Sequence, residues 1–154
     1  MTKLCTVCLK SDILCAGCSR KLERGEITKI DMELERALFR LGIEVEFIKS
    51  FDEGNIYVMA TKKQAGLLIG RAGRNAKRLG IMLGKGIRII EATDDEKLLI
   101  ERVLGFQVTG INKVYASGNE IHKIRMHRKY KERTANYSQV LAKMIGRPVS
   151  FVFE

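Results

Sequence analysis

Residues 67–79 read Leu67-Leu68-Ile69-Gly70-Arg71-Ala72-Gly73-Arg74-Asn75-Ala76-Lys77-Arg78-Leu79. Apolar residues lead into a Gly-x-x-Gly loop, and the loop opens onto a helix whose first residues are basic. The two glycines let another backbone approach closely. A helix N-terminus offers unpaired N–H groups and a partial positive charge to a phosphate. The segment is therefore predicted to bind phosphate groups.

The elements predicted around this loop give it a setting. Apolar residues three to four apart predict an amphipathic helix over 28–41, with Gly42 as its stop. Strands are predicted at 44–49 and 55–61, joined by a turn at 51–54. A short helix ending at Ile69, a helix over 74–83 and a strand at 87–91 complete the region. The predicted order is helix, strand, strand, helix, loop, helix, strand.

The second half of the chain repeats part of that order. A helix is predicted over 95–104, strands at 107–116 and 120–126, a helix over 134–145 and a strand at 149–153. Ser117-Gly118-Asn119 marks a hairpin between the two middle strands. The stretch 126–137 contains no glycine, so the Gly-x-x-Gly loop is missing. We expect a second domain of the same type without its loop.

All four cysteines lie within the first eighteen residues, as Cys5-x2-Cys8-x6-Cys15-x2-Cys18. Two such pairs can wrap one tetrahedral Zn²⁺, because each two-residue spacer lets both sulfurs face one point. Disulfide frameworks usually spread their cysteines along the chain. The pattern predicts one structural zinc ion in a compact knuckle over 1–26, with no open coordination position. Disulfides, a redox pair, unrelated thiols and an iron–sulfur cluster are the alternatives.

The charge of the chain favours a polyanionic partner. The net charge is +10 and the sequence pI is near 9.6, which makes nucleic acid the leading class. We find neither the amphipathic apolar helix nor the lipidation site that a membrane-surface protein needs. There is no signal-like N-terminus and no run of 18 apolar residues, so a cytoplasmic location is expected.

The segment Ile69-Gly70-Arg71-Ala72-Gly73, set between two short helices after a hairpin and before a strand, resembles the type II KH domain. The resemblance implies an α+β fold with a KH domain at 27–93 and a degenerate KH-like domain at 94–154, packed in tandem. The zinc knuckle at 1–26 is an addition to this family pattern. In KH domains this loop clamps about four nucleotides of single-stranded RNA. The bases would lie in a groove floored by aliphatic side chains. The candidates are Leu68, Ile69, Leu79, Ile87 and Ile89, each with plain core packing as the alternative.

The resemblance and the charge pattern together identify candidate RNA-binding residues in both halves. Those of the first half are Ile69, Gly70, Arg71, Ala72, Gly73, Arg74, Asn75, Lys77 and Arg78. Those of the second half are Lys123, Arg125, Arg128 and Lys129, with Lys131 and Arg133 close by in the sequence. The second group either keeps phosphate contacts without the loop or is a solvated charged linker.

Tandem KH units of this size resemble the archaeal NusA-like proteins, which are linked to transcription elongation and termination. The resemblance implies a regulatory factor on nascent RNA, with RNA polymerase as a possible partner. An adaptor of the ribosome or an RNA-processing complex is the alternative, and single-stranded DNA binding ranks lower. No enzyme and no small-molecule substrate are expected. Only two histidines exist, His122 and His127, and neither has an obvious catalytic partner in the sequence.

Overall fold

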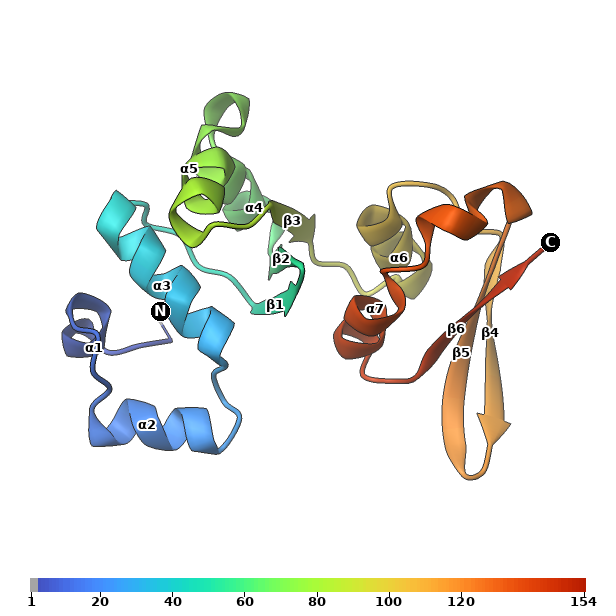
Figure 1. Cartoon of the computed structure of the whole chain (residues 1–154), viewed down its shortest axis with the longest axis horizontal. Coiled ribbons are helices and arrows are strands. Elements are labelled where there is room, and N and C mark those ends of the chain that lie inside the picture. The colour runs from blue at the N-terminus through green and yellow to red at the C-terminus, as the bar shows by residue number, and fades with distance from the viewer. Residues whose placement is uncertain (1–2) are drawn as a thin grey trace. The chain divides into compact units, whose positions relative to one another are not determined.

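The structure is a computed structural model that describes residues 3–154. The chain divides into two compact units, Met1–Glu91 and Ala92–Glu154, each with its own three-stranded sheet (Figure 1). The fold is mixed α+β. Within the described residues, no helix has the length and apolar character needed to cross a membrane.

The first unit contains six elements of the predicted order, preceded by two short helices. The helices are α1 (Thr6–Lys10), α2 (Ala16–Glu23), α3 (Lys29–Leu41), α4 (Lys62–Ile69) and α5 (Arg74–Leu83), with a 3-10 turn η1 (Arg71–Gly73) before α5. The strands are β1 (Lys49–Glu53), β2 (Asn55–Ala60) and β3 (Ile87–Glu91). β2 is the central strand, antiparallel to β1 and parallel to β3.

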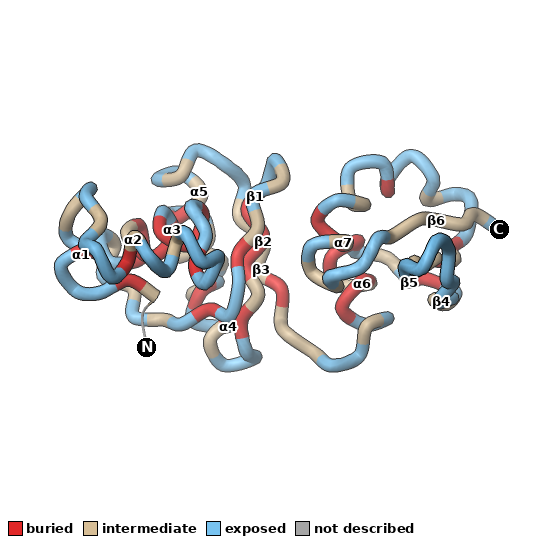
Figure 2. The backbone as a smooth tube through the Cα atoms, turned by 90° about the horizontal axis from the view of Figure 1, so that it is seen from below, coloured by how far each residue is buried: buried red, intermediate tan, exposed pale blue. Residues whose placement is uncertain are grey.

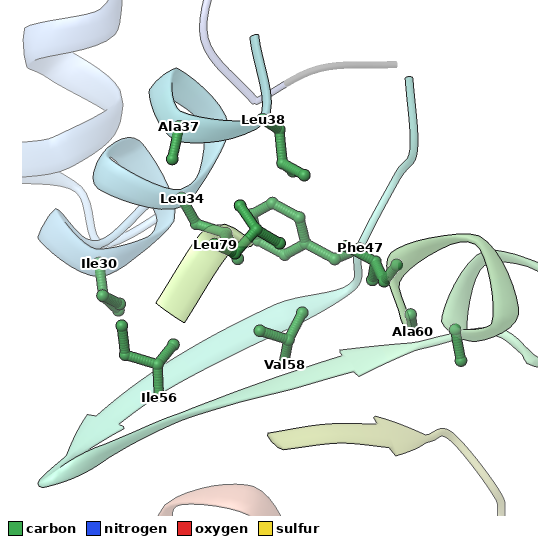
Figure 3. Close-up of a cluster of buried hydrophobic side chains, with 11 residues drawn as sticks. Ile30, Leu34, Ala37, Leu38, Phe47, Ile56, Val58, Ala60 and Leu79 are labelled. Carbon is green, nitrogen blue, oxygen red and sulfur yellow. The ribbon is translucent and has the colours of Figure 1, made fainter. Parts of the chain in front are cut away.

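The core of the first unit forms between α3, β2 and the two helices that flank the loop (Figure 3). Helix α3 contributes side chains spaced three to four residues apart, which places them on one face. They meet Ile56 and Val58 of β2 and Leu79 of α5. The buried members of this cluster are Ile30, Leu34, Ala37, Leu38, Phe47, Ile56, Val58, Ala60, Ala65, Leu68 and Leu79.

The ends of α3 confirm the helix that was predicted over 28–41. Thr28 is the N-cap, and its hydroxyl accepts the N–H of Asp31 at 3.2 Å while the Asp31 carboxylate accepts the N–H of Thr28 at 3.0 Å. The buried Asp31 also accepts a hydrogen bond from the Ser50 hydroxyl of β1. Gly42 ends the helix with φ +69. The same carboxylate thus caps the helix and ties it to the sheet.

The strand predicted at 44–49 is wrong, because the strand is Lys49–Glu53. The segment 43–47 has no regular structure. Its apolar side chains alternate as they would in a strand, since Ile43, Val45 and Phe47 all pack against the core. The N–H of Glu46, however, donates to the side chain of Gln64 at 3.0 Å. The alternation of apolar residues therefore predicts which side chains face the core, but it does not predict whether the backbone pairs with another strand.

The second unit has the same strand order and directions. Its elements are α6 (Glu96–Leu104), β4 (Gly110–Ala116), β5 (Asn119–Met126), a 3-10 turn η2 (Arg128–Arg133), α7 (Ser138–Ile145) and β6 (Val149–Phe153). β5 is central, antiparallel to β4 and parallel to β6. The helix predicted over 134–145 begins only at Ser138, because η2 and a turn occupy the preceding residues. Buried residues of α6 and α7 form the core together with Ile124 and Met126 of β5 (Figure 2).

Leu34→Ala is expected to destabilise the first unit by about 2–5 kcal/mol, because Leu34 is fully buried and a cavity would replace it. Hydrogen exchange of the β2 amides in the intact chain would measure this, and the β5 amides would serve as an internal reference. The neighbouring exposed residue offers a matched control. Glu33→Ala should change stability by less than about 0.5 kcal/mol. Equal effects of the two substitutions would contradict the assigned core.

Candidate metal centre and nucleic-acid interface

The four cysteines converge at the starts of two short helices. Cys5 precedes α1 and Cys8 lies in its first turn, while Cys15 and Cys18 repeat this arrangement at α2. Their four sulfur atoms all lie within 4.8 Å of one another, and the Sγ atoms of Cys5 and Cys15 are 3.8 Å apart. A tetrahedral ion with sulfur ligands at about 2.3 Å needs sulfurs roughly 3.8 Å apart. The arrangement therefore suits one metal ion.

Backbone N–H groups favour the thiolate form at this cluster. The N–H of Cys18 donates to the Cys15 sulfur at 3.4 Å, and this bond, with the neighbouring thiols, lowers the pKa of Cys15 to about 6. The N–H of Cys15 likewise donates to the Cys8 sulfur at 3.2 Å. Although this second bond favours the thiolate, burial and the other thiols raise the pKa of Cys8 to about 12. Cys15 is therefore deprotonated much more readily than Cys8.

The cysteine segment is built onto α3. Leu4, Leu9 and the buried cysteines pack with Ile27 and with Met32 of α3. The Nε atom of Arg36 donates to the carbonyl oxygen of Cys8 at 3.1 Å. The segment predicted as a knuckle over 1–26 therefore belongs to the same compact unit as the sheet. Contacts between residues 28 positions apart make this attachment, which sequence spacing does not reveal.

The Gly-x-x-Gly loop has a backbone that only certain residues adopt. Gly70, Ala72 and Gly73 have φ of +73, +56 and +74. A Cβ atom on Gly70 would lie 2.7 Å from the Asn75 side chain, so glycine is needed there for space as well. The Nδ2 atom of Asn75 donates to the carbonyl oxygen of Leu67 at 2.9 Å. Asn75, predicted to bind RNA, is thus engaged in bracing the loop.

The charge around the loop is of one sign. Residues 62–90 include eight lysines and arginines and no aspartate or glutamate. The predicted residues Arg71, Arg74, Lys77 and Arg78 are all exposed. They occupy η1 and the first turns of α5, where the helix presents unpaired N–H groups. An anion at this loop would meet cations and no opposing carboxylate from the surrounding segment.

A groove of about 570 Å³ runs beside α5 toward the start of β3. Its lining combines Ile81, 83% exposed, with Ile87 and with Lys77 and Lys85. Three glycines also line it: Gly80, Gly84 and Gly86. A Cβ atom on Gly80 would lie 3.0 Å from the carbonyl oxygen of Lys85, so the helix and the following loop run close together. Sequence reasoning missed Ile81, Lys85 and these glycines.

Core packing, the alternative kept for each candidate of the aliphatic floor, holds for part of the set. Leu68 and Leu79 are fully buried members of the core, because they face α3 and β2. Ile87 lines the groove, and Ile69 is 41% exposed next to the loop. Ile89 is half-buried against the core. Within the predicted set, only Ile69 and Ile87 are available to a ligand at the loop or the groove.

The basic candidates of the second unit differ in exposure. Lys123 and Arg125 are half-buried on β5, and the Nη1 atom of Arg125 lies 3.7 Å from a Glu154 carboxylate oxygen. Arg128 and Lys129 are exposed on η2. This places the freely accessible positive charge of the predicted set on η2 rather than on the strand.

An aromatic pair that sequence reasoning missed supports η2. Phe106 and Tyr130 stack with ring centroids 4.1 Å apart and planes 9° apart. The Nζ atom of Lys129 lies 5.0 Å from the Tyr130 ring centroid, and the Arg133 guanidinium lies 6.0 Å from that of Phe106. Tyr130 within the basic run was the available signal, but its partner is 24 positions away along the chain.

Comparison with known proteins gives a fold and no function. No protein-family model matches the chain, and no curated protein matches it in sequence. A solved structure titled "Crystal structure of APE1850" is similar, with a TM-score of 0.62 and 22% sequence identity. The match covers 78% of this chain and 95% of that one. At this identity the likeness shows the fold alone.

Metal binding at pH 7 is expected to release protons, because Cys8 with a pKa of about 12 is then a thiol and must become a thiolate. Affinity should fall further as pH drops through about 6, where Cys15 also becomes protonated. Titration calorimetry with Zn²⁺ in two buffers of different ionisation enthalpy would count the protons. A binding heat that is the same in both buffers would contradict this ligand set. So would a Zn²⁺ affinity that does not change between pH 5 and pH 8.

Proposed function

We propose that this protein binds single-stranded RNA through the Gly-x-x-Gly loop of a type II KH domain. The observation that carries the proposal is the loop itself. It is a turn at Gly70–Gly73 whose tip, Arg71 and Ala72, is exposed; Asn75 braces it, and its segment 62–90 has eight cations and no carboxylate. The sequence resemblance implied the order helix, strand, strand, helix, helix, strand, and the first unit has that order.

The phosphates of the RNA backbone would bind at the start of α5. Gly73 leaves open space beside the backbone, where a ribose–phosphate chain can approach and which a side chain at this position would occupy. Unpaired N–H groups at the helix start and the side chains of Arg71 and Arg74 then face the phosphate oxygens. These contacts carry no sequence information, so they fix the strand without selecting it.

The bases would lie in the groove beside α5. Ile81 and Ile87 offer apolar surface to base faces, and the exposed Lys77 is available to phosphates. Lys85 is paired with Asp52, since its Nζ atom lies 2.6 Å from a carboxylate oxygen. Single-stranded bases are recognised on such surfaces through stacking and edge contacts. The groove is thus the element of the proposal that selects a base sequence.

The metal in the cysteine cluster is proposed to be a structural zinc ion. Four thiolates in tetrahedral range are the ligand set typical of structural zinc, and they leave no position for a substrate or water. Zinc would supply folding free energy to a segment of small apolar content. Cys5, Cys8, Cys15 and Cys18 would hold it, and the backbone N–H groups of Cys15 and Cys18 would stabilise the thiolates.

The biological role we propose is that of a NusA-like regulator acting on nascent RNA. Two units with the same strand order and directions support a tandem architecture, and the net charge of +10 favours RNA. The second candidate is an adaptor of the ribosome or of an RNA-processing complex. It is favoured by Val7 and Ile13 of the cysteine segment, 69% and 77% exposed, which offer apolar surface to a protein.

Arg71→Asp combined with Ala72→Asp is expected to abolish binding of a short single-stranded RNA while the fold persists. Both side chains are exposed, and aspartate tolerates the left-handed backbone at position 72. Fluorescence anisotropy at two salt concentrations would measure the loss, and the wild-type affinity should fall steeply with salt.

A matched control exists in the second unit. Lys113→Asp with Ser117→Asp makes the same change in charge at exposed positions, and Ser117 has φ +51, close to that of Ala72. This control should reduce RNA affinity only slightly. If both double variants lose binding equally, general charge rather than the loop binds the RNA.

Removal of the metal by a chelator is expected to unfold α1 and α2 while RNA binding by the loop persists. The reason is that the cluster of the cysteine segment is separate from the core formed by α3, β2, α4 and α5. Hydrogen exchange of the α1, α2 and β2 amides, with RNA affinity measured on the same sample, would test both statements. Loss of protection in β2, or loss of RNA binding, would show that the metal supports the whole unit.

A further inference from the structure

A second groove of the first unit lies between α1, α3 and the segment 42–46, with a volume of about 620 Å³. Its apolar lining comes from Leu9 of α1, from Leu38 and Phe39 of α3, and from Ile43 and Val45. Phe39 is 44% exposed, although it lies on a helix whose other apolar side chains are largely buried. The lining shares no residue with the Gly-x-x-Gly loop or with the groove beside α5.

The charge of this groove is opposite to that of the chain. Glu35, Glu44 and Glu46 line it, and its described lining residues include no lysine or arginine. The whole chain has 28 lysines and arginines against 18 aspartates and glutamates, so a rim of carboxylates alone is a local reversal. Burial raises the pKa of Glu35, although the N–H of Lys3 donates to its carboxylate at 3.1 Å. A phosphate would be repelled here.

Local hydrogen bonds hold the groove in shape. Gly42 ends α3 in the left-handed conformation, and the N–H of Ile43 donates to the carbonyl oxygen of Leu38 at 3.0 Å. The N–H of Glu46 donates to the Gln64 side chain at 3.0 Å, which anchors the segment to α4. The groove is therefore preformed, which reduces the entropy lost when a ligand binds.

We infer that this groove binds a protein segment in which a large apolar side chain is flanked by lysine or arginine. The apolar floor fits the anchor, and the exposed Glu44 and Glu46 complement the flanking cations. The volume lies within the range of about 300–1,000 Å³ that is typical of ligand-binding clefts. This inference is independent of the proposed RNA binding, because the groove shares no residue with the loop and has the opposite charge.

The test uses the full chain, loaded with zinc and labelled with ¹⁵N. It is titrated with the synthetic peptide Lys-Arg-Leu-Phe-Lys-Arg and with the same peptide carrying glutamate at its four basic positions. The basic peptide should cause saturable shifts at the amides of Phe39, Gly42, Glu44 and Gln64, and the acidic peptide should not. Equal shifts from both peptides, or no saturable shift from the basic one, would overturn the inference.

Charge reversal sharpens the test. Glu44→Lys with Glu46→Lys should weaken binding of the basic peptide by roughly tenfold or more and should allow the acidic peptide to bind. Glu33→Lys with Glu132→Lys makes the same change in net charge at exposed positions outside the groove, and it should leave both affinities near those of wild type. Equal weakening in the two double variants would overturn the inference. So would saturable shifts of the same groove amides by a short RNA.

Discussion

The burial of α3 on two sides is the interaction on which the first unit depends. One side packs Leu34 and Leu38 against β2 and α5, and the other places Met32 against the cysteine segment. The buried Asp31 carboxylate fixes the start of α3 in two ways: it caps the helix, and it accepts a hydrogen bond from Ser50 of β1. A buried carboxylate is tolerated only when such partners satisfy it. The four-cysteine cluster and the loop are thus attached to one helix by different contacts.

This arrangement frees the ends of α4 and α5 for a ligand. Leu68 and Leu79 serve the core, so the exposed residues between them need not support the fold through burial. Their conformation is maintained locally, by positive φ angles and by the hydrogen bond from Asn75 to Leu67. The second unit has the same strand order but has η2 in place of a glycine loop. There Lys129 and Arg133 lie over the rings of the Phe106–Tyr130 pair. The two units therefore present positive charge in physically different ways.

The sequence predicted the elements whose signals are local. Helix α3, the helices around the loop and the strands at 87–91 and 149–153 follow from periodicity, caps and glycines. The strand at 44–49 was misplaced because alternation reflects burial, whereas pairing depends on β2. Three features could not be predicted, because they arise from contacts between residues far apart in the sequence. They are the hydrogen bond from Arg36 to the Cys8 carbonyl oxygen, the Phe106–Tyr130 pair and the acidic groove.

Photocrosslinking of a 4-thiouridine RNA to the full zinc-loaded chain, with mass spectrometry to locate the adducts, would identify the residues that contact RNA. We predict adducts on residues 69–78 and on the Ile81 and Ile87 side of the α5 groove. Adducts confined to the cysteine segment, to the acidic groove or to η2 would contradict the claim that the Gly-x-x-Gly loop is the RNA-binding element.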